Sequence, residues 1–218
     1  MLLMDVGRDE MDEIVSRAVA ALAGGELVVM PTDTVYGLAA RGDVEAAVMR
    51  IYAAKRRPAE RPLPVLVPDV AALRRYGRDV PETAEVLARA FWPGPLTIVV
   101  PRADAIPAWV TAGKDAVGLR QPDDPLALAI LRAADFPVAV TSANISGDAT
   151  PWRAQECVAA LAESVAVAIE AGPLVSKPST VVKVDEGGVT VLRAGPISAA
   201  QLCEALGPGV EVREADEQ

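Results

Sequence analysis

Apolar side chains recur along this chain at two spacings, and each spacing predicts one kind of element. Between Met11 and Leu22 they recur every three or four residues, which is the period of an amphipathic helix. Asp9 precedes this helix as a candidate N-cap, and Gly24 follows it as a stop signal. Elsewhere the apolar residues form short continuous runs, such as the run at 27–30, which predict buried strands.

The same two patterns predict helices and strands that alternate along the rest of the chain. Further helices are expected after an Asp43 cap, at 82–91, after Asp124-Pro125, at 153–163, and from a Ser198 cap to Leu206. Further strands are expected at 63–67, 96–100, 116–120, 138–141, 165–170, 180–184 and 189–193, with a hairpin turn between the last two. This alternation predicts a single α/β domain over 1–210 with a mixed, twisted sheet, followed by a frayed acidic tail at 211–218.

Composition narrows the possible chemistry. The 218 residues, of which 51% are hydrophobic, are enough to bury the core of one domain. The start of the chain has no signal-peptide pattern and no apolar run has the length of a membrane-spanning helix, so a cytoplasmic protein is expected. The net charge of −9 argues against a nucleic-acid-binding surface over the whole molecule. Cys157 and Cys203 lie in predicted helices and are expected to be buried thiols.

The chain contains no histidine, which excludes Ser-His and Cys-His catalysis and histidine-ligated metal sites. Polar residues instead cluster where predicted strands end, the place where open α/β sheets bind ligands. The first cluster brings Thr32, Asp33 and Thr34 together, and composition alone favours a turn in which they hydrogen-bond their own backbone. The second, at 55–61, holds four cations and one anion. It is either a solvated loop or a site that concentrates positive potential on a polyphosphate.

The third cluster surrounds Asn144, the only asparagine of the chain, and a capped turn explains it as well as a binding site does. Ser179 and Thr180 begin a predicted strand, while Arg120 and Arg193 end two others, where arginine often simply reaches solvent. Together, hydroxyls, an amide and arginines at strand ends favour binding of amino-acid carboxylates and phosphates. Catalysis would then consist of positioning and of charge stabilisation of a transferring phosphoryl group.

Several segments in these clusters resemble the YrdC-like (TsaC) family of threonylcarbamoyl-adenylate synthases. They occur in the family's order between residues 10 and 206, and they are Pro31-Thr32-Asp33-Thr34-Val35-Tyr36-Gly37-Leu38, Lys55-Arg56-Arg57-Pro58 with Arg61-Pro62-Leu63, Phe91-Trp92-Pro93-Gly94-Pro95-Leu96-Thr97, Ser142-Ala143-Asn144-Ile145-Ser146-Gly147, Ser179-Thr180-Val181-Val182 and Leu192-Arg193-Ala194-Gly195. The resemblance implies the single-domain form of the family. Its fold is one twisted open α/β domain with a mixed sheet around a concave cavity.

The resemblance also implies an activity. It implies a nucleotidyltransferase that converts L-threonine, bicarbonate and ATP into threonylcarbamoyl-AMP and pyrophosphate, for the threonylcarbamoyladenosine modification of tRNA. Mg²⁺ is expected to arrive with ATP, without dedicated protein ligands. A threonylcarbamoyl-transferase partner enzyme is expected to use the product, contact with tRNA is expected to be weak or indirect, and no membrane is expected to take part.

The resemblance further implies roles for individual residues. Thr32, Lys55 and Arg57 form the catalytic set, and Thr32, Arg120 and Ser142 bind threonine. The residues assigned to ATP are Lys55, Arg57, Arg61, Asn144, Ser179, Thr180 and Arg193, and none is assigned to a metal.

The chain departs from the family pattern at five positions. Leu66 stands where many members have a histidine that helps to hold threonine, and Arg61 stands where many have asparagine. Trp152 and Ala116 replace common hydroxyl residues, so two polar nucleotide contacts are expected to be missing. Asp124 replaces another frequent histidine, outside the chemistry.

Two other functions stay open at this point. One is an RNA-binding module of the same fold without catalysis, although the acidic composition and the four lysines argue against it. The other is a carbamoyl-handling domain like those of hydrogenase maturation proteins, which usually lie beside zinc-finger and acylphosphatase modules that this sequence lacks.

Overall fold

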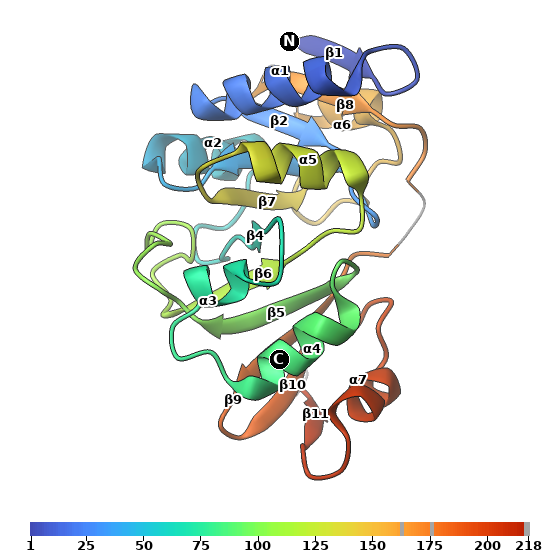
Figure 1. Ribbon diagram of the computed structural model, residues 1–218. Coiled ribbons are helices and arrows are strands. Elements are labelled where there is room, and N and C mark those ends of the chain that lie inside the picture. Colours follow the sequence, from blue (N-terminus) through green and yellow to red (C-terminus); the bar gives the residue numbers. More distant parts are fainter. Residues whose placement is uncertain (162–163, 175–176, 216–218) are drawn as a thin grey trace.

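The computed structural model describes residues 1–161, 164–174 and 177–215, shown in Figure 1. Its strands are β1 (Leu2–Asp5), β2 (Leu27–Met30), β3 (Gly37–Arg41), β4 (Val65–Leu66), β5 (Leu96–Pro101), β6 (Ala116–Arg120), β7 (Val138–Ser142), β8 (Val165–Glu170), β9 (Thr180–Asp185), β10 (Gly188–Arg193) and β11 (Val212–Glu214). Its helices are α1 (Met11–Ala23), α2 (Glu45–Lys55), α3 (Ala72–Tyr76), α4 (Glu82–Phe91), α5 (Pro125–Ala133), α6 (Ala154–Leu161) and α7 (Ala199–Leu206).

All these strands join in one sheet in the order β1-β8-β2-β3-β7-β4-β6-β5-β9-β10-β11. Parallel pairs such as β2 with β8 occur beside antiparallel pairs such as β2 with β3. The predicted α/β class and mixed sheet are therefore confirmed.

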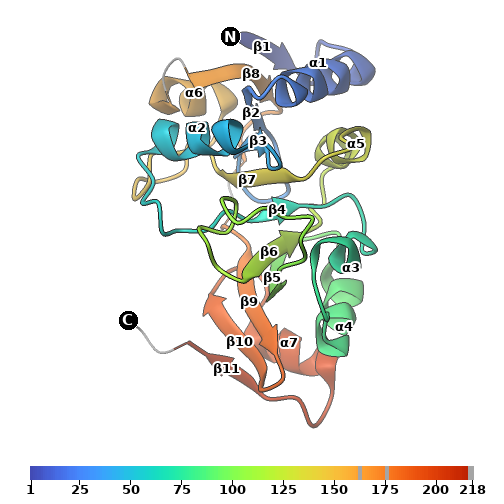
Figure 2. The same ribbon diagram turned by 90° about the vertical axis from the view of Figure 1, so that its left-hand side faces the viewer.

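One half of the sheet, formed by β1, β8, β2, β3 and β7, is covered on both faces. Figure 2 shows α1 and α5 on one side of these strands and α2 and α6 on the other. Every residue of β2 is buried, as expected for a strand that lies between two helical layers. We call this part the doubly covered half.

The other half, formed by β6, β5, β9 and β10, is covered on one face only. Helices α4 and α7 pack on that face, and in Figure 2 no helix of the described residues lies over the opposite one. Burial along β9 alternates accordingly, since Val182 and Val184 are buried while Val181 is half-buried and Lys183 is exposed. We call this part the singly covered half, and its bare side the open face.

Several predicted elements are confirmed at their predicted bounds: the strands at 27–30, 116–120 and 165–170 and the helix at 82–91. The hairpin of β9 and β10 is also confirmed. Asp124 caps α5 by accepting a hydrogen bond from Ala127 N at 2.7 Å, and Ser198 caps α7 in a capping box with Gln201. The predicted helix at 153–163 is described as far as Leu161, and its last two positions lie outside the described residues.

Two predicted N-caps are wrong because each carboxylate has another partner. Asp9 accepts a hydrogen bond from Asp5 N at 2.7 Å, and Glu10 occupies the N-cap position of α1. Asp43 pairs with Arg41 at 2.6 Å, so α2 begins after Val44 without a side-chain cap. A nearby donor thus outcompeted the amides of the first helical turn.

Other expectations were incomplete or wrong. Strands β1 and β3 and the short helix α3 were not predicted, and β4 has only two residues. The tail is not frayed throughout, because β11 pairs in parallel with β10; residues 216–218 lie outside the described part. Cys157 is buried as expected, but Cys203 is exposed. Among the described residues, no helix has the length and hydropathy needed to cross a membrane.

Candidate functional site

The segment at 31–36 connects β2 to β3, and its hydroxyls are already hydrogen-bonded within the turn. Thr32 Oγ1 donates to Val35 O at 2.7 Å and accepts from Thr34 N at 3.2 Å, and its residue is 4% exposed. The turn interpretation is thus realised for Thr32, whereas Asp33 accepts from Arg120 and Asp123 N and Thr34 Oγ1 accepts from Arg120. It does not exclude a binding role, because the turn also shapes a neighbouring contact.

That contact is a buried cation, Arg120, at the end of β6. Its Nη2 lies 2.5 Å from Asp33 Oδ1, its Nη1 donates to Thr34 Oγ1 at 2.9 Å, and its Nε donates to Gly94 O at 3.0 Å. Burial lowers the pKa of Arg120, and the Asp33 carboxylate opposes this effect. A guanidinium carries five N–H groups, so two remain for a ligand when three hold it in place.

Strand pairing brings the third cluster against this turn. Gly37 pairs with Ser142 across β3 and β7, and Ala143 N donates to Tyr36 O at 2.8 Å. Gly37 has no side-chain room, since a Cβ there would lie 2.6 Å from Val140 Cγ1. The close strand approach therefore depends on glycine, and it places Ser142 beside the turn that contains Thr32.

Lys55, the last residue of α2, is enclosed by the third cluster. Its Nζ donates to Ser142 O, to Asn144 O at 2.6 Å and to Asn144 Oδ1 at 2.9 Å, which uses all three donors of the ammonium. Ser142 Oγ donates to the same amide oxygen at 2.6 Å, and Asn144 Nδ2 donates to Asp148 O at 2.6 Å. Lys55 therefore holds the Ser142–Asn144 loop in this conformation.

Arg57 lies two residues beyond α2 and is less enclosed. Its Nη2 donates to Pro62 O at 2.9 Å and its Nε to Arg61 O at 3.3 Å, and the residue is half-buried. Arg61 itself is exposed. Both side chains keep N–H groups available at the edge of the site.

The fourth group of candidates lies where β9 begins. Arg193 donates to Ser179 O at 2.8 Å and to Ser179 Oγ at 3.1 Å, and Ser179 Oγ lies 2.8 Å from Thr97 Oγ1. Thr180 is fully buried, with its hydroxyl donating to Ile197 O and accepting from Ile197 N. A Cβ on Gly195 would lie 2.3 Å from Thr180 N, so this close packing depends on glycine.

The cations of these clusters lie close enough for the positive charge of one to lower the pKa of another. Burial and the charge of Arg57 lower the pKa of Lys55 to about 8. Partial burial and the same charge lower the pKa of Arg193. The charge of Arg193 in turn adds to the lowering of the pKa of Arg120. Such mutual repulsion is relieved when an anion binds among the cations.

The positions at which the chain departs from the pattern of the family that it resembles have distinct surroundings. Leu66 is buried and pairs with Arg120 across β4 and β6. It lines a cavity of about 260 Å³ between α3 and α5 that is otherwise bounded mainly by apolar side chains, including Leu131 and Phe136. Asp124 caps α5, which explains an aspartate there. Ala116 is half-buried at the start of β6.

Three residues of the site were not assigned a role from the sequence. Asp33 and Thr34 position Arg120, and Thr97 bonds Ser179. All three lie inside the segments that carry the family resemblance, so their position was visible in the sequence, but their partners were not. The structure brings the assigned residues together around strand ends, and their assignments to threonine or ATP stay predictions.

The open mixed sheet defines an α/β protein, and its cationic, hydroxyl-lined strand ends form a candidate site for small anionic ligands. Residues 20–195 match the Sua5/YciO/YrdC family model, which is described as "Telomere recombination". The chain belongs to this family, and the resemblance inferred from its motifs is confirmed.

Relatives of the chain include threonylcarbamoyl-AMP synthases. The Bacillus subtilis protein of that name is 39% identical over 199 residues, which are 90% of this chain and 58% of the relative. The Vibrio cholerae protein of that name is 36% identical over 160 residues, which are 72% of this chain and 85% of the relative. The structure of Pyrococcus abyssi Sua5 complexed with L-threonine superposes with a TM-score of 0.90 at 34% identity, over 97% of this chain and 62% of that one. The chain thus spans about three fifths of the length of the Bacillus and Pyrococcus proteins.

Proposed function

We propose that this chain is an L-threonylcarbamoyladenylate synthase, a nucleotidyltransferase that makes threonylcarbamoyl-AMP and pyrophosphate from L-threonine, bicarbonate and ATP. One observation carries the proposal. Arg57, Arg120 and Arg193 lie close enough for their charges to interact, near Ser142 and Asn144, in a family whose relatives include proteins named threonylcarbamoyl-AMP synthase. The absence of histidine agrees with a reaction between bound substrates that needs no imidazole.

On the threonine side, Arg120 is the principal anchor. Asp33, Thr34 and Gly94 hold its guanidinium, so the two remaining N–H groups meet the substrate carboxylate in a fixed orientation. The hydroxyl of Thr32 donates to Val35 O and accepts from the amides of Thr34 and Val35, so Thr32 meets a substrate through its methyl group. Ser142 completes this side, and the threonine amine takes up CO2 derived from bicarbonate to form the carbamate.

On the ATP side, the cations stabilise charge on the transferring group. A carbamate oxygen forms a bond to the α-phosphorus while the bond between that phosphorus and the bridging oxygen breaks, and pyrophosphate leaves with the electron pair. Arg57, Arg61 and Arg193 bind the phosphates, and Asn144 is oriented for the nucleotide by Lys55. Ser179 orients Arg193, and Thr180 contributes through the packing of β9 rather than through its bonded hydroxyl.

Mg²⁺ would enter on the triphosphate, where it neutralises phosphate charge. A Mg²⁺ ion that arrives on ATP takes its ligands from phosphate oxygens and water, so this proposal assigns no protein side chain to it. The product is a mixed anhydride, and a threonylcarbamoyl-transferase partner would transfer its acyl group to tRNA. Direct contact of this chain with tRNA would be weak.

The test is pyrophosphate release by the purified protein with ATP and Mg²⁺. Release is expected only when threonine and bicarbonate are both present, and a product with the mass of threonylcarbamoyl-AMP should appear. Equal release without threonine would disprove the proposal. Salt-sensitive binding of tRNA without threonine-dependent turnover would instead favour the RNA-binding alternative.

A further inference from the structure

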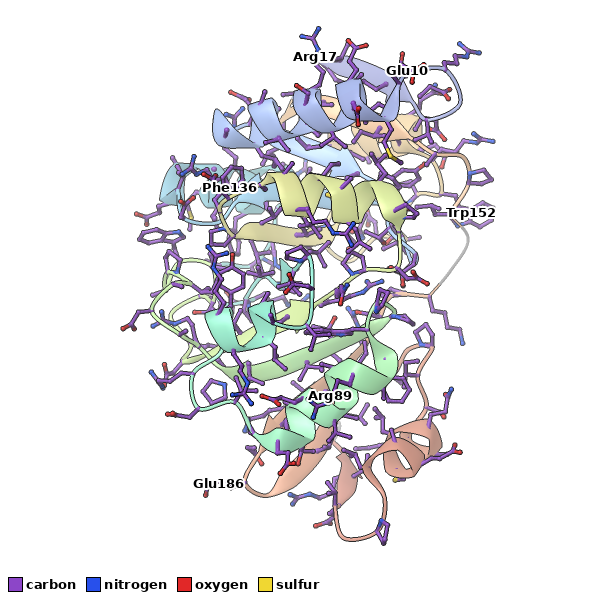
Figure 3. All side chains as sticks on the ribbon, in the orientation of Figure 1. Glu10, Arg17, Arg89, Phe136, Trp152 and Glu186 are labelled. Carbon is purple, nitrogen blue, oxygen red and sulfur yellow. The ribbon has the colours of Figure 1, made fainter. Side chains whose placement is uncertain are left out.

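The cavity between α3 and α5 lies outside the proposed catalytic site, and we call it the α3–α5 cavity. Its volume is about 260 Å³, and none of the residues proposed to bind threonine or ATP lines it. Its apolar wall is formed mainly by Leu66, Leu131 and Phe136, the last of which Figure 3 labels beside the end of α5. Pockets for drug-sized ligands have volumes of about 300–1,000 Å³, so this cavity fits a smaller ligand with an apolar body.

Tyr76, the last residue of α3, adds a polar group to the lining of this cavity. The residue is only 5% exposed, and its hydroxyl has no hydrogen-bond partner among the described residues. Burial raises the pKa of Tyr76, so the hydroxyl keeps its proton at neutral pH. Buried polar groups in native proteins normally have a partner, and a ligand or an ordered water supplies one where the protein does not.

Two opposite charges, Arg75 and Asp69, lie at the exposed edge of the cavity. Both line it, and neither forms an ion pair within the part of the chain that the structure describes. Asp69 Oδ1 accepts from Ala72 N at 2.9 Å, which leaves Oδ2 available. The guanidinium carbon of Arg75 lies 5.3 Å from the centre of the Tyr76 ring. Besides burial, the charge of Arg75 lowers the pKa of Tyr76 and that of Asp69 raises it, so both charges lie near its hydroxyl.

We propose that the α3–α5 cavity binds the zwitterion of an amino acid with an apolar side chain. The side chain of this ligand packs against Leu131 and Phe136. Its carboxylate contacts the guanidinium of Arg75 and the hydroxyl of Tyr76, and its ammonium contacts Asp69. A zwitterion pairs both charges at once, which a simple carboxylate or a simple amine does not. The inference goes beyond the proposed function and does not depend on it, because the two sites share no assigned residue.

The first test is isothermal titration calorimetry with three probes of similar apolar shape. L-Leucine should bind to the purified protein. The probe 4-methylpentanoate lacks the ammonium and 3-methylbutylamine lacks the carboxylate, so each should bind about tenfold more weakly through the loss of one charge-assisted contact. Equal affinities for the three probes, or no binding of L-leucine at millimolar concentration, would overturn the inference.

The second test compares two neighbouring arginines. Arg75→Ala should weaken the binding of L-leucine about tenfold. Arg74→Ala is the matched control, because Arg74 pairs with Glu85 and does not line the cavity, and it should leave the affinity unchanged. An equal loss in both variants would show that leucine responds only to surface charge, which contradicts a built site.

Two further variants act on the cavity itself. Ala134→Leu places a larger side chain in the lining and should abolish the binding of L-leucine. Tyr76→Phe removes only the hydroxyl and should weaken the binding, so it carries the test if Ala134→Leu does not fold. Unchanged leucine affinity in Tyr76→Phe and in a folded Ala134→Leu would refute binding in this cavity.

Competition with L-threonine separates the two sites. L-Threonine should not displace L-leucine, because its hydroxyl would lie without a partner against Leu131 and Phe136. Displacement would mean that leucine occupies the substrate site, and it would overturn the inference. Binding of leucine without threonine-dependent pyrophosphate release would support the cavity site and contradict only the proposed synthase activity, so the two failures are distinguishable.

Discussion

The two halves of the sheet carry similar strands but different surroundings. In the doubly covered half, both faces of β2 are packed under helices. In the singly covered half, β9 and β10 bury only alternate side chains, and Val181, Thr190 and Leu192 remain partly or largely exposed on the open face. The same sheet therefore provides a rigid core at one end and a bare surface at the other.

The proposed site lies where this coverage changes. Helix α2 ends at Lys55, which is 1% exposed and fully bonded, and Arg57 follows just beyond the helix with donors still available. On β6, Gly118 lies on the open face, where a Cβ would be 3.2 Å from Thr97 Cγ2. The buried cation at the end of the helix, Lys55, therefore supports the site. The cation beyond the helix, Arg57, can contact a ligand.

The largest expected loss of activity comes from replacing Arg57, the cation just beyond the end of α2. Arg57→Ala should lower threonine-dependent pyrophosphate release about a thousandfold, because a guanidinium on a transferring phosphoryl group is worth that much or more. The melting temperature should stay near the wild-type value, since the hydrogen bonds of Arg57 reach only the carbonyls of Arg61 and Pro62.

The matched control is Arg50→Ala on the exposed side of α2, where the arginine pairs with Glu26 at 2.6 Å. Such a surface pair contributes about 0–1 kcal/mol, and the turnover of this variant should equal that of the wild type. Near-normal turnover in Arg57→Ala would show that the phosphates bind elsewhere.

The second prediction concerns Lys55, the buried cation at the end of α2, and the pH dependence of protein stability. The pKa of Lys55 in the folded protein, about 8, lies below its ordinary value of 10.5. Between these two pH values the unfolded chain binds more protons than the folded one, so the free energy of unfolding should rise with pH relative to Lys55→Met. The full rise would be about 3 kcal/mol, measured by denaturant unfolding of both proteins from pH 7.5 to 10.5.

A flat or falling difference would reverse this interpretation. It would mean that the three oxygens around Lys55 Nζ stabilise the ammonium more than burial disfavours it. Lys55 would then behave as a charged anchor at every pH of interest.

The smallest effect compares two valines. Val28 on β2 is fully buried in the core beneath α1 and α5, whereas Val181 on β9 lies on the open face. Val28→Ala should cost about 2 kcal/mol of unfolding free energy, and Val181→Ala less than about 0.5 kcal/mol. Chemical denaturation measures both, and equal losses would show that the open face is covered in solution.

Much of the fold was predictable because local pattern and tertiary packing agree. The apolar run at 27–30 and the capping box at Ser198 have the same structure that their sequences predict. Strand β3, Gly37–Arg41, was missed because glycine and alanine have weak strand preference, and its pairing with β2 and β7 outweighs that preference. Asp9 and Asp43 were wrongly predicted to be N-caps. Each carboxylate accepts from a donor that lies closer than the amides of the first helical turn, and the sequence does not show which donor is closer.

The sequence alone determined the alternation of helices and strands, the absence of imidazole chemistry and, through its ordered motifs, the family. Only the tertiary structure decided which polar groups are already satisfied. Asp33 holds Arg120 across 87 positions of the chain, and Lys55 holds Asn144 across 89. Hydrogen-bond partners so far apart in sequence depend on how strands are ordered in the sheet, which local periodicity does not encode. The same ordering leaves one face bare, and there the proposed site can receive its ligands.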